Sequence, residues 1–317
     1  MDTKNLNRIF ASVAFIVSLI TYSLTVQPTV PFWDCGEFTA AAVQQQVPHP
    51  PGAPLFLMFG KIFDLLPIGS SSDPGIRVNM VSVVANAVTI LLLYLTTVMV
   101  INAFRKKPLE SMGEAIAVYG SALVGALAFN FSDTFWFNGV ESEVYASSTL
   151  FVALVSYLMM LWWEKADTKG HERYLVLLFY VIGLSIGVHL LALLAIFSIV
   201  YLIYFRKYTY SHQGFAVTTV LSLVVFAVIY KFIVSYLPML LAGNFGKNEL
   251  REYCTQNSML LTLFGIGIIA AGVVLVVRGI QTKNNILALV SSSFVLVIIG
   301  YTTYTHILIR ANANPPM

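Results

Sequence analysis

Runs of apolar residues, each close to the length that crosses a lipid bilayer, constrain this chain more than any other feature. A transmembrane helix needs about 20 consecutive apolar residues. Segments of this kind occur at 8–26, 77–104, 113–131, 144–163, 173–188, 190–205, 215–237, 258–278 and 286–309. With 58% apolar and 10% charged residues, the chain lies outside the range of soluble and disordered proteins. The sequence therefore predicts an all-α polytopic membrane protein with about nine transmembrane helices.

The charge and the cysteines exclude several classes of protein. The formal net charge of +3 is too small to indicate a polyanionic partner, so we expect no nucleic acid. The two cysteines, Cys35 and Cys254, form neither a disulfide framework nor a zinc motif. Both are expected to be free thiols, although a pairing stays open because both are predicted to lie on one side of the membrane. No phosphate-binding or dinucleotide-binding glycine motif occurs, which argues against nucleotide-driven chemistry.

The distribution of basic residues predicts the orientation in the membrane. Lys4 and Arg8 precede the first apolar run, and the cluster 105–107 follows the second, so the positive-inside rule places both in the cytoplasm. This holds only if the short apolar stretch 51–66 enters and leaves on the outer face as a re-entrant or interfacial helix. We therefore expect one transmembrane domain over 1–317, with the N-terminus inside, the C-terminus outside and an outer loop at 27–76.

The first outer loop carries two carboxylates in the segment Phe32-Trp-Asp-Cys-Gly-Glu-Phe38. Asp34 and Glu37 are three residues apart, which places both on one side of a helix. The aromatic residues around them are typical of the membrane interface. His49 follows among prolines just before the short helix, whose N-terminus favours an anion. The pattern predicts either a site for chemistry or a solvated surface loop.

A second pair of acids, Glu141 and Glu143, lies at the mouth of the crossing 144–163. Residues two apart diverge around a helix, so only one of the two is expected to face the bundle. Glu143, deeper in the predicted helix and followed by Tyr145, is the better candidate.

Further polar residues fall on the same predicted outer face. They are Arg77 and Asn79 at the start of the second long crossing, His189 in the turn between two short helices, and Arg310 at the end of the last helix. Each is also explained as an ordinary anchor or a structural residue. Acids, histidines and arginines that converge at one membrane face favour a site for an anionic, lipid-linked substrate.

The order of these segments resembles the GT-C membrane glycosyltransferases. It resembles more closely a bacterial family of unknown function that is related to a eukaryotic transmembrane protein O-mannosyltransferase. The stretches that carry the resemblance are Phe32-Trp-Asp-Cys-Gly-Glu-Phe38, Pro48-His-Pro-Pro-Gly52, Arg77-Val-Asn79, Glu143-Val-Tyr145 and Gly187-Val-His189. They cover about the first 190 residues.

The resemblance implies an inverting transfer of a sugar from a polyprenyl-phosphate carrier to Ser or Thr hydroxyls of exported proteins. Asp34 would be the general base, and Glu37 and Glu143 would stabilise the reacting sugar. The implied contacts of the donor phosphate are Arg77, His189, His49 and Arg310, and the implied substrate-binding residues are Glu141, Asn79, Trp33 and Tyr145. No metal ligand is assigned, although a divalent cation (Mg²⁺ or Mn²⁺) held by Asp34 and Glu143 stays open.

The same resemblance implies a bacterial inner membrane, with the site on the periplasmic face. The terminal segment 312–316 is similar to the junction at which many bacterial members continue into a long extracytoplasmic region. Two other interpretations remain. One is a transporter or flippase for a lipid-linked or anionic solute, which would require charges near the bilayer midplane. The other is a non-catalytic membrane subunit.

Overall fold

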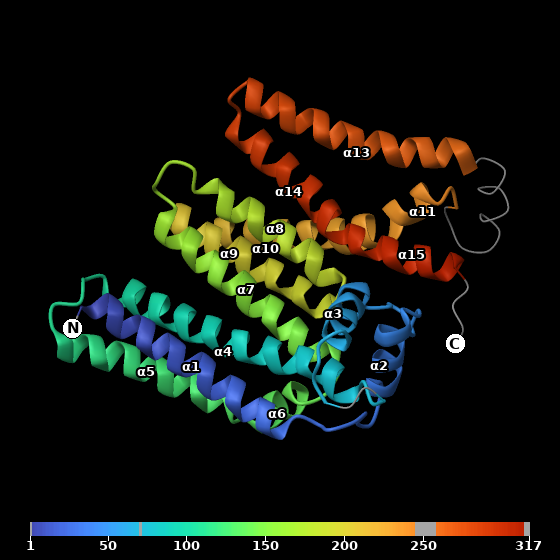
Figure 1. Cartoon of the computed structure of the whole chain (residues 1–317). Coiled ribbons are helices and arrows are strands. Elements are labelled where there is room, and N and C mark those ends of the chain that lie inside the picture. Colours follow the sequence, from blue (N-terminus) through green and yellow to red (C-terminus); the bar gives the residue numbers. More distant parts are fainter. Residues whose placement is uncertain (1, 70–71, 245–257, 314–317) are drawn as a thin grey trace. The chain divides into compact units, whose positions relative to one another are not determined.

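A computed structural model describes residues 2–69, 72–244 and 258–313, and these residues form helices joined by turns (Figure 1). The helices of the first half are α1 (Thr3–Thr25), α2 (Cys35–Gln44), α3 (Pro54–Asp64), α4 (Gly75–Arg105), α5 (Met112–Asn130), α6 (Asp133–Gly139) and α7 (Val144–Lys165). Those of the second half are α8 (Glu172–Ile186), η1 (Leu190–Leu194), α9 (Ala195–Lys207), α10 (His212–Ala227), η2 (Val228–Tyr236), α11 (Leu237–Leu241), α13 (Ser258–Gln281), α14 (Asn285–Tyr301), η3 (Thr302–Tyr304) and α15 (Thr305–Asn312). The prediction of an all-α polytopic membrane protein is confirmed. Cys254, which was expected to be a free thiol, lies outside the described residues.

Eight helices in the described part of the chain are long and apolar enough to cross a membrane, one fewer than the sequence suggested. The difference is α8, which has 15 residues and ends where Val188 and His189 both donate backbone hydrogen bonds to the Ser185 carbonyl. The short helix α3 has 11 residues, a length of about 16 Å, and is too short to span a bilayer. The predicted non-spanning helix is therefore present.

The chain divides into two compact units. Unit 1 comprises Met1–Met160, Ser185–Ala192 and Thr303–Met317, and unit 2 comprises Leu161–Leu184 and Leu193–Thr302. In unit 1, α1, α4 and α5 pack against one another around small and aromatic side chains such as Ala14, Tyr94 and Ala122. The Tyr94 hydroxyl donates a 2.7 Å hydrogen bond to the side chain of Asn7, which satisfies a polar group that lipid could not.

The segment between α1 and α4 in unit 1 contains the helix pair α2 and α3. The two helices approach closely at Gly60, where an added Cβ would lie 2.6 Å from the Cβ of Ala42, and the rings of Phe38 and Phe56 meet at 5.5 Å. The amide of Asn79 donates to the carbonyls of Gln27 and Thr29 at 2.8 and 3.0 Å and so fixes the chain that leads into the loop.

Helix α15 also belongs to unit 1 and contacts the loop. Arg310 donates hydrogen bonds to the carbonyls of Gln44 and Gln45, at the C-terminal end of α2. A cation is favourable there because the last carbonyls of a helix carry partial negative charge. The Arg310 guanidinium thus binds the end of α2 that is opposite to Asp34. The two ends are separated by the length of the helix, about 15 Å.

Unit 2 contains the pair α13 and α14, the pair α9 and α10, and the π-helix η2. Helices α8 and α14 approach closely at two glycines. A Cβ added to Gly183 would lie 2.3 Å from the Val297 carbonyl oxygen, and one added to Gly300 would lie 2.5 Å from the Leu184 nitrogen. Small residues of this kind let helix backbones meet in a membrane, where van der Waals packing replaces the hydrophobic effect.

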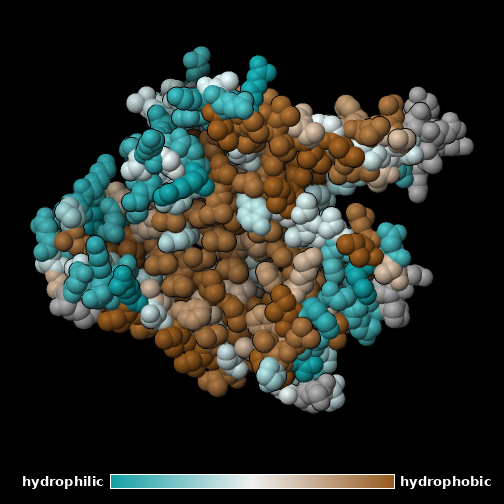
Figure 2. Space-filling model, turned by 45° about the horizontal axis from the view of Figure 1, so that its top comes forward, coloured by the Kyte–Doolittle hydropathy of each residue, from teal (hydrophilic) through white to brown (hydrophobic). Residues whose placement is uncertain are grey.

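Apolar side chains cover much of the molecular surface, and hydrophilic ones gather toward the margins of the face shown in Figure 2. On α13 only 11% of the most apolar stretch is buried, and Met259, Leu260 and Val274 are 76%, 68% and 62% exposed. Exposed apolar surface of this extent identifies lipid as the surrounding solvent.

The predicted orientation gives a labelling test in a variant in which Cys35 and Cys254 are alanine. Leu66→Cys, just after α3, should react with a membrane-impermeant maleimide applied from outside. Lys107→Cys, after α4, should react only when the membrane is permeabilised. The opposite pattern at the two sites would overturn the orientation and the non-spanning assignment of α3.

Gly183→Leu should lower the melting temperature in detergent because its side chain would collide with the backbone of α14. Overpacking of this kind costs about 1–3 kcal/mol. Gly267→Leu is the matched control, since an added Cβ there meets nothing within 4 Å. Equal melting temperatures for the two variants would contradict the close contact of α8 with α14.

Candidate acidic site

The site begins where the chain turns into α2. Trp33 has a left-handed backbone (φ 62°), which is uncommon for a bulky residue, and its side chain is 86% exposed. Asp34 is the N-cap residue of α2, yet its side chain makes no capping hydrogen bond. Its carboxylate is exposed and available to other groups.

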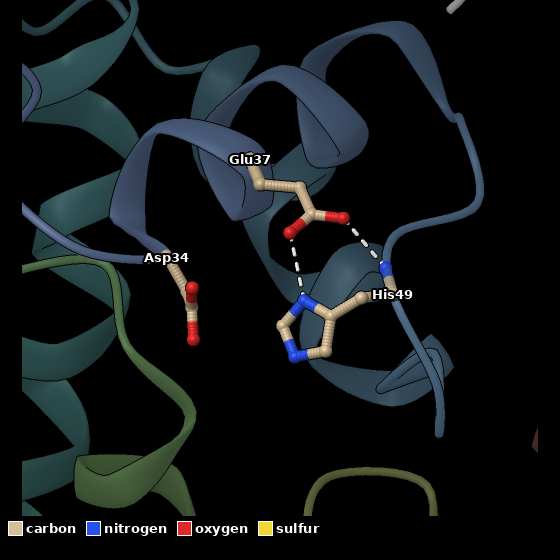
Figure 3. Close-up of side chains that lie close together, drawn as sticks. All are labelled: Asp34, Glu37 and His49. Carbon is tan, nitrogen blue, oxygen red and sulfur yellow. Dashed lines mark hydrogen bonds and ion pairs between the residues drawn. The ribbon is translucent and has the colours of Figure 1, made fainter.

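Glu37, in the first turn of α2, binds His49 at two points (Figure 3). One carboxylate oxygen accepts a 2.6 Å hydrogen bond from the His49 backbone N–H, and the other lies 2.7 Å from the ring Nδ1. The imidazole also packs against Phe38 at 5.6 Å between ring centroids. Glu37 therefore fixes both the loop and the ring, and this pairing brings His49 beside Asp34 as well.

The pair is electrostatically complementary. Partial burial works to raise the pKa of Glu37, but the hydrogen bonds from the ring and backbone of His49 outweigh it and lower that pKa below its usual value. The hydrogen bond to Glu37 raises the pKa of His49, and partial burial opposes it. Both shifts favour a carboxylate paired with an imidazolium.

Glu141 and Glu143 are both buried, with 4% and 6% of their surface exposed. The sequence placed Glu143 inside a helix and expected the two acids to diverge. The structure instead begins α7 at Val144 and puts both acids in the turn after α6, where their geometry is not helical. Between them, Ser142 shares a 2.8 Å hydrogen bond with Thr39 and donates to the Cys35 carbonyl at 3.2 Å, which ties this turn to the first turn of α2.

Burial dominates the acidity of these groups. It raises the pKa of Glu141 to about 7, with a further contribution from the charge of Glu143. Burial also raises the pKa of Glu143, although the hydrogen bond from the Val144 N–H acts against it and the charge of Asp34 adds to it. The pKa of the Cys35 thiol rises to about 12, first through burial and then through the two glutamates. Cys35 is therefore an unreactive, buried thiol.

Asp34, Glu37, His49, Glu141 and Glu143 are called the acidic cluster below. Among the described residues, none of its four carboxylates forms an ion pair with a lysine or arginine. The charges of Asp34 and His49 both act on Glu143, so the residues from the two turns share one electrostatic environment.

Tyr145 and His189 lie next to each other beside this turn, with ring centroids 5.5 Å apart. The His189 Nδ1 accepts a 3.1 Å hydrogen bond from the Leu191 N–H, and burial lowers the pKa of His189. The ring is therefore neutral at pH 7 and carries its proton on Nε2, as a hydrogen-bond donor. The Gly187 carbonyl accepts from Leu55, at the start of α3, and so positions this turn against the loop.

Arg77 belongs to a different group of side chains. Its guanidinium lies 3.0 Å from Asp64, with Lys61 also 3.0 Å from the same carboxylate. Both partners of the Arg77–Asp64 pair are about nine-tenths buried. Asp64 was not among the residues singled out by the sequence, although its i, i+3 spacing from Lys61 is a signal for such a pair.

The positions of the remaining candidates are also defined. Asn79 fixes the backbone before the loop, and Arg310 caps the far end of α2. The acidic cluster thus combines residues from the loop 27–76 and the turn before α7, whereas Arg77, Asn79 and Arg310 have backbone or ion-pair partners elsewhere in unit 1.

These features define a polytopic helical membrane protein with an acidic site outside its spanning helices. The family described as "Protein O-mannosyl-transferase TMEM260 N-terminal domain" matches residues 34–212, more than half of the chain, and this chain belongs to that family. The matched region begins at Asp34 and contains the whole acidic cluster.

Two curated relatives are similar to this chain over part of its length. The chain is 28% identical over 160 residues to protein O-mannosyl-transferase tmem260 of Dictyostelium discoideum, which is 50% of this chain and 18% of that protein. It is 30% identical over 179 residues to protein O-mannosyl-transferase TMEM260 of Mus musculus, 56% of this chain and 22% of that protein. The match thus spans about a fifth of each relative. No solved structure matches significantly.

Removing either partner of the buried Arg77–Asp64 pair should destabilise the fold. The cost should be about 3 kcal/mol for Asp64→Asn, which leaves the Arg77 guanidinium buried without this carboxylate, and smaller for Arg77→Ala, because Asp64 keeps Lys61. Arg77→Ala and Asp64→Asn should therefore melt at lower temperature, and the exposed Arg8→Ala should not. Burial works to raise the pKa of Asp64, but Lys61 and Arg77 outweigh it and lower that pKa. The stabilisation is thus complete above the unfolded value of about 4 and is lost as the pH falls below it. Unchanged melting of Arg77→Ala would contradict this role.

Proposed function

We propose that this protein transfers a mannose-type sugar from a polyprenyl-phosphate carrier to Ser or Thr hydroxyls of exported proteins. The observation that carries the proposal is the free carboxylate of Asp34 beside the Glu37–His49 pair, in a chain that belongs to a family described as protein O-mannosyl-transferases. The relatives' names supply the sugar, and the apolar helices around the site suit a lipid-linked donor. The site would lie on the outer face of a bacterial inner membrane.

Asp34 is the proposed general base. The acceptor oxygen attacks the anomeric carbon, its proton passes to the Asp34 carboxylate, and the bond between the anomeric carbon and the phosphate oxygen breaks. The lipid phosphate leaves with the bonding electron pair. Attack from the face opposite to the phosphate inverts the configuration of the sugar. A base suited to this step must be exposed and must have a carboxylate oxygen free for the acceptor hydroxyl. Asp34 is exposed and its side chain makes no capping hydrogen bond.

Glu143 and Glu37 have supporting roles in this proposal. The anomeric carbon develops positive charge in the transition state, and nearby carboxylates stabilise it. Glu37 also orients His49, whose ring proton it accepts. Tyr145, Trp33 and Glu141 remain proposed contacts of the sugar or acceptor. The two aromatic side chains are exposed and can therefore reach a bound substrate.

His189 is the proposed contact of the leaving phosphate. Its neutral ring can donate from Nε2 because Nδ1 accepts from the backbone. Such a donor is most valuable when charge gathers on the leaving oxygen. Arg77 and Arg310 were expected to act there too, but their guanidinium groups are engaged by Asp64 and by the end of α2, so the proposal does not depend on them.

Asp34→Asn should reduce transfer by about 10²–10⁴-fold, since it removes the basic oxygen and keeps the size of the side chain. The assay combines the full chain, a polyprenyl-phosphate mannose and a Ser/Thr peptide, with mass spectrometry of the product. Asp133→Asn is the matched control, because Asp133 is also exposed at the start of a short helix in unit 1. Transfer by Asp34→Asn at the parent rate would refute the base assignment, and no transfer by the parent would refute the function.

A further inference from the structure

Three side chains of the acidic cluster bring metal-ligating atoms close together (Figure 3). One oxygen of Asp34, one oxygen of Glu37 and one ring nitrogen of His49 all lie within 4.8 Å of one another. Two atoms bound to one ion at about 2.2 Å are at most about 4.4 Å apart. Small movements of these exposed side chains, together with release of one ring proton from the His49 imidazolium, are therefore needed for all three to bind one ion.

The surrounding charge supplies an independent argument. Only 6% of Glu143 is exposed, and its carboxylate accepts a hydrogen bond from the N–H of the next residue, Val144. The charges of Asp34 and His49 act on it, so it lies beside the three ligating groups. A buried carboxylate is costly unless a cation or several donors compensate it. No lysine or arginine in the described ranges pairs with it.

We propose that Asp34, Glu37 and His49 bind one divalent transition-metal ion, of the Mn²⁺ or Zn²⁺ type. The ligand set argues for this class, because Mg²⁺ and Ca²⁺ prefer sites made of oxygen atoms, whereas an imidazole nitrogen suits transition metals. The set differs from the pair Asp34 and Glu143 considered from the sequence. Glu143 is buried and contributes negative potential, while His49 enters as a ligand.

The fold holds two of the three ligands in position before an ion binds. One oxygen of Glu37 accepts from the His49 backbone N–H at 2.6 Å, which fixes the loop that carries the imidazole. The ring also packs against Phe38. Preorganised ligands of this kind bind more tightly because less conformational freedom is lost on binding.

The catalytic consequence rests on the proposed function. A bound cation would offset the negative charge of the donor phosphate and of the leaving group. Arg77 and Arg310, the arginines expected to do so from the sequence, have other partners. Asp34 would give one oxygen to the ion and keep the other for the acceptor hydroxyl.

The test measures binding of Mn²⁺ alone to the purified full chain, by loss of the free-ion signal in electron paramagnetic resonance. The parent should bind one Mn²⁺ per chain. Glu37→Gln and His49→Ala should each bind at least about tenfold more weakly. Glu172→Gln and His212→Ala are the matched controls and should bind like the parent. Melting temperatures and size-exclusion profiles identify the variants that remain folded.

The outcomes separate this site from the proposed function. No binding by the parent, or parent-like binding by folded Glu37→Gln and His49→Ala, would overturn the metal site. Transfer that persists in excess EDTA would overturn its catalytic role and leave the transferase proposal standing. Site-dependent Mn²⁺ binding without any sugar transfer would support the metal site and contradict the proposed function.

Discussion

A bilayer interior offers no hydrogen-bond partners, and this constraint decides where the chemistry of this chain can lie. Backbone groups are satisfied inside helices, so the spanning segments are built from apolar residues with few ionisable groups. Acids and histidines are then confined to the short helices and turns outside those segments. The acidic cluster is such a place, formed by the first turn of α2, the loop before α3 and the turn before α7.

Within that cluster, the Glu37–His49 pair organises the site. Glu37 binds the backbone and the ring of a residue twelve positions away, which closes the loop between α2 and α3. Ser142 joins the turn of the buried glutamates to the start of α2 through Thr39 and the Cys35 carbonyl. Asp34 is left exposed at the junction of the two. The same contacts therefore support both a general base and a candidate metal site.

The sequence predicted the helices well because bilayer-spanning runs are a strong local signal. It also predicted that Asp34 and Glu37 share one side, since this follows from helical spacing alone. It did not predict the pairing of Glu37 with His49 or of Arg77 with Asp64, because both depend on how the chain folds back. The expectation that Glu141 and Glu143 diverge around a helix was wrong, because α7 begins at Val144, where the predicted crossing 144–163 also begins, and both acids are buried in the turn before it.

The roles of the arginines show the same limit. An arginine near a helix end at a membrane face has the same sequence pattern whether it binds a phosphate or a neighbouring helix. The ion pair with Asp64 and the bonds to the carbonyls of Gln44 and Gln45 distinguish the two cases. Asp34, which has no strong partner in the described residues, therefore stays a candidate for chemistry. The sequence did not reveal that Arg77 and Arg310 already have partners.

The most direct measurement of the central claim is an experimental structure of the full chain with a polyprenyl-phosphate sugar bound. The account predicts that the anomeric carbon lies beside the Asp34 carboxylate, with room for an acceptor oxygen about 3–3.5 Å from that carbon. It also predicts that the phosphate is within hydrogen-bond reach of His189. A headgroup bound beside Arg77 and Asp64, or away from the acidic cluster altogether, would contradict the account.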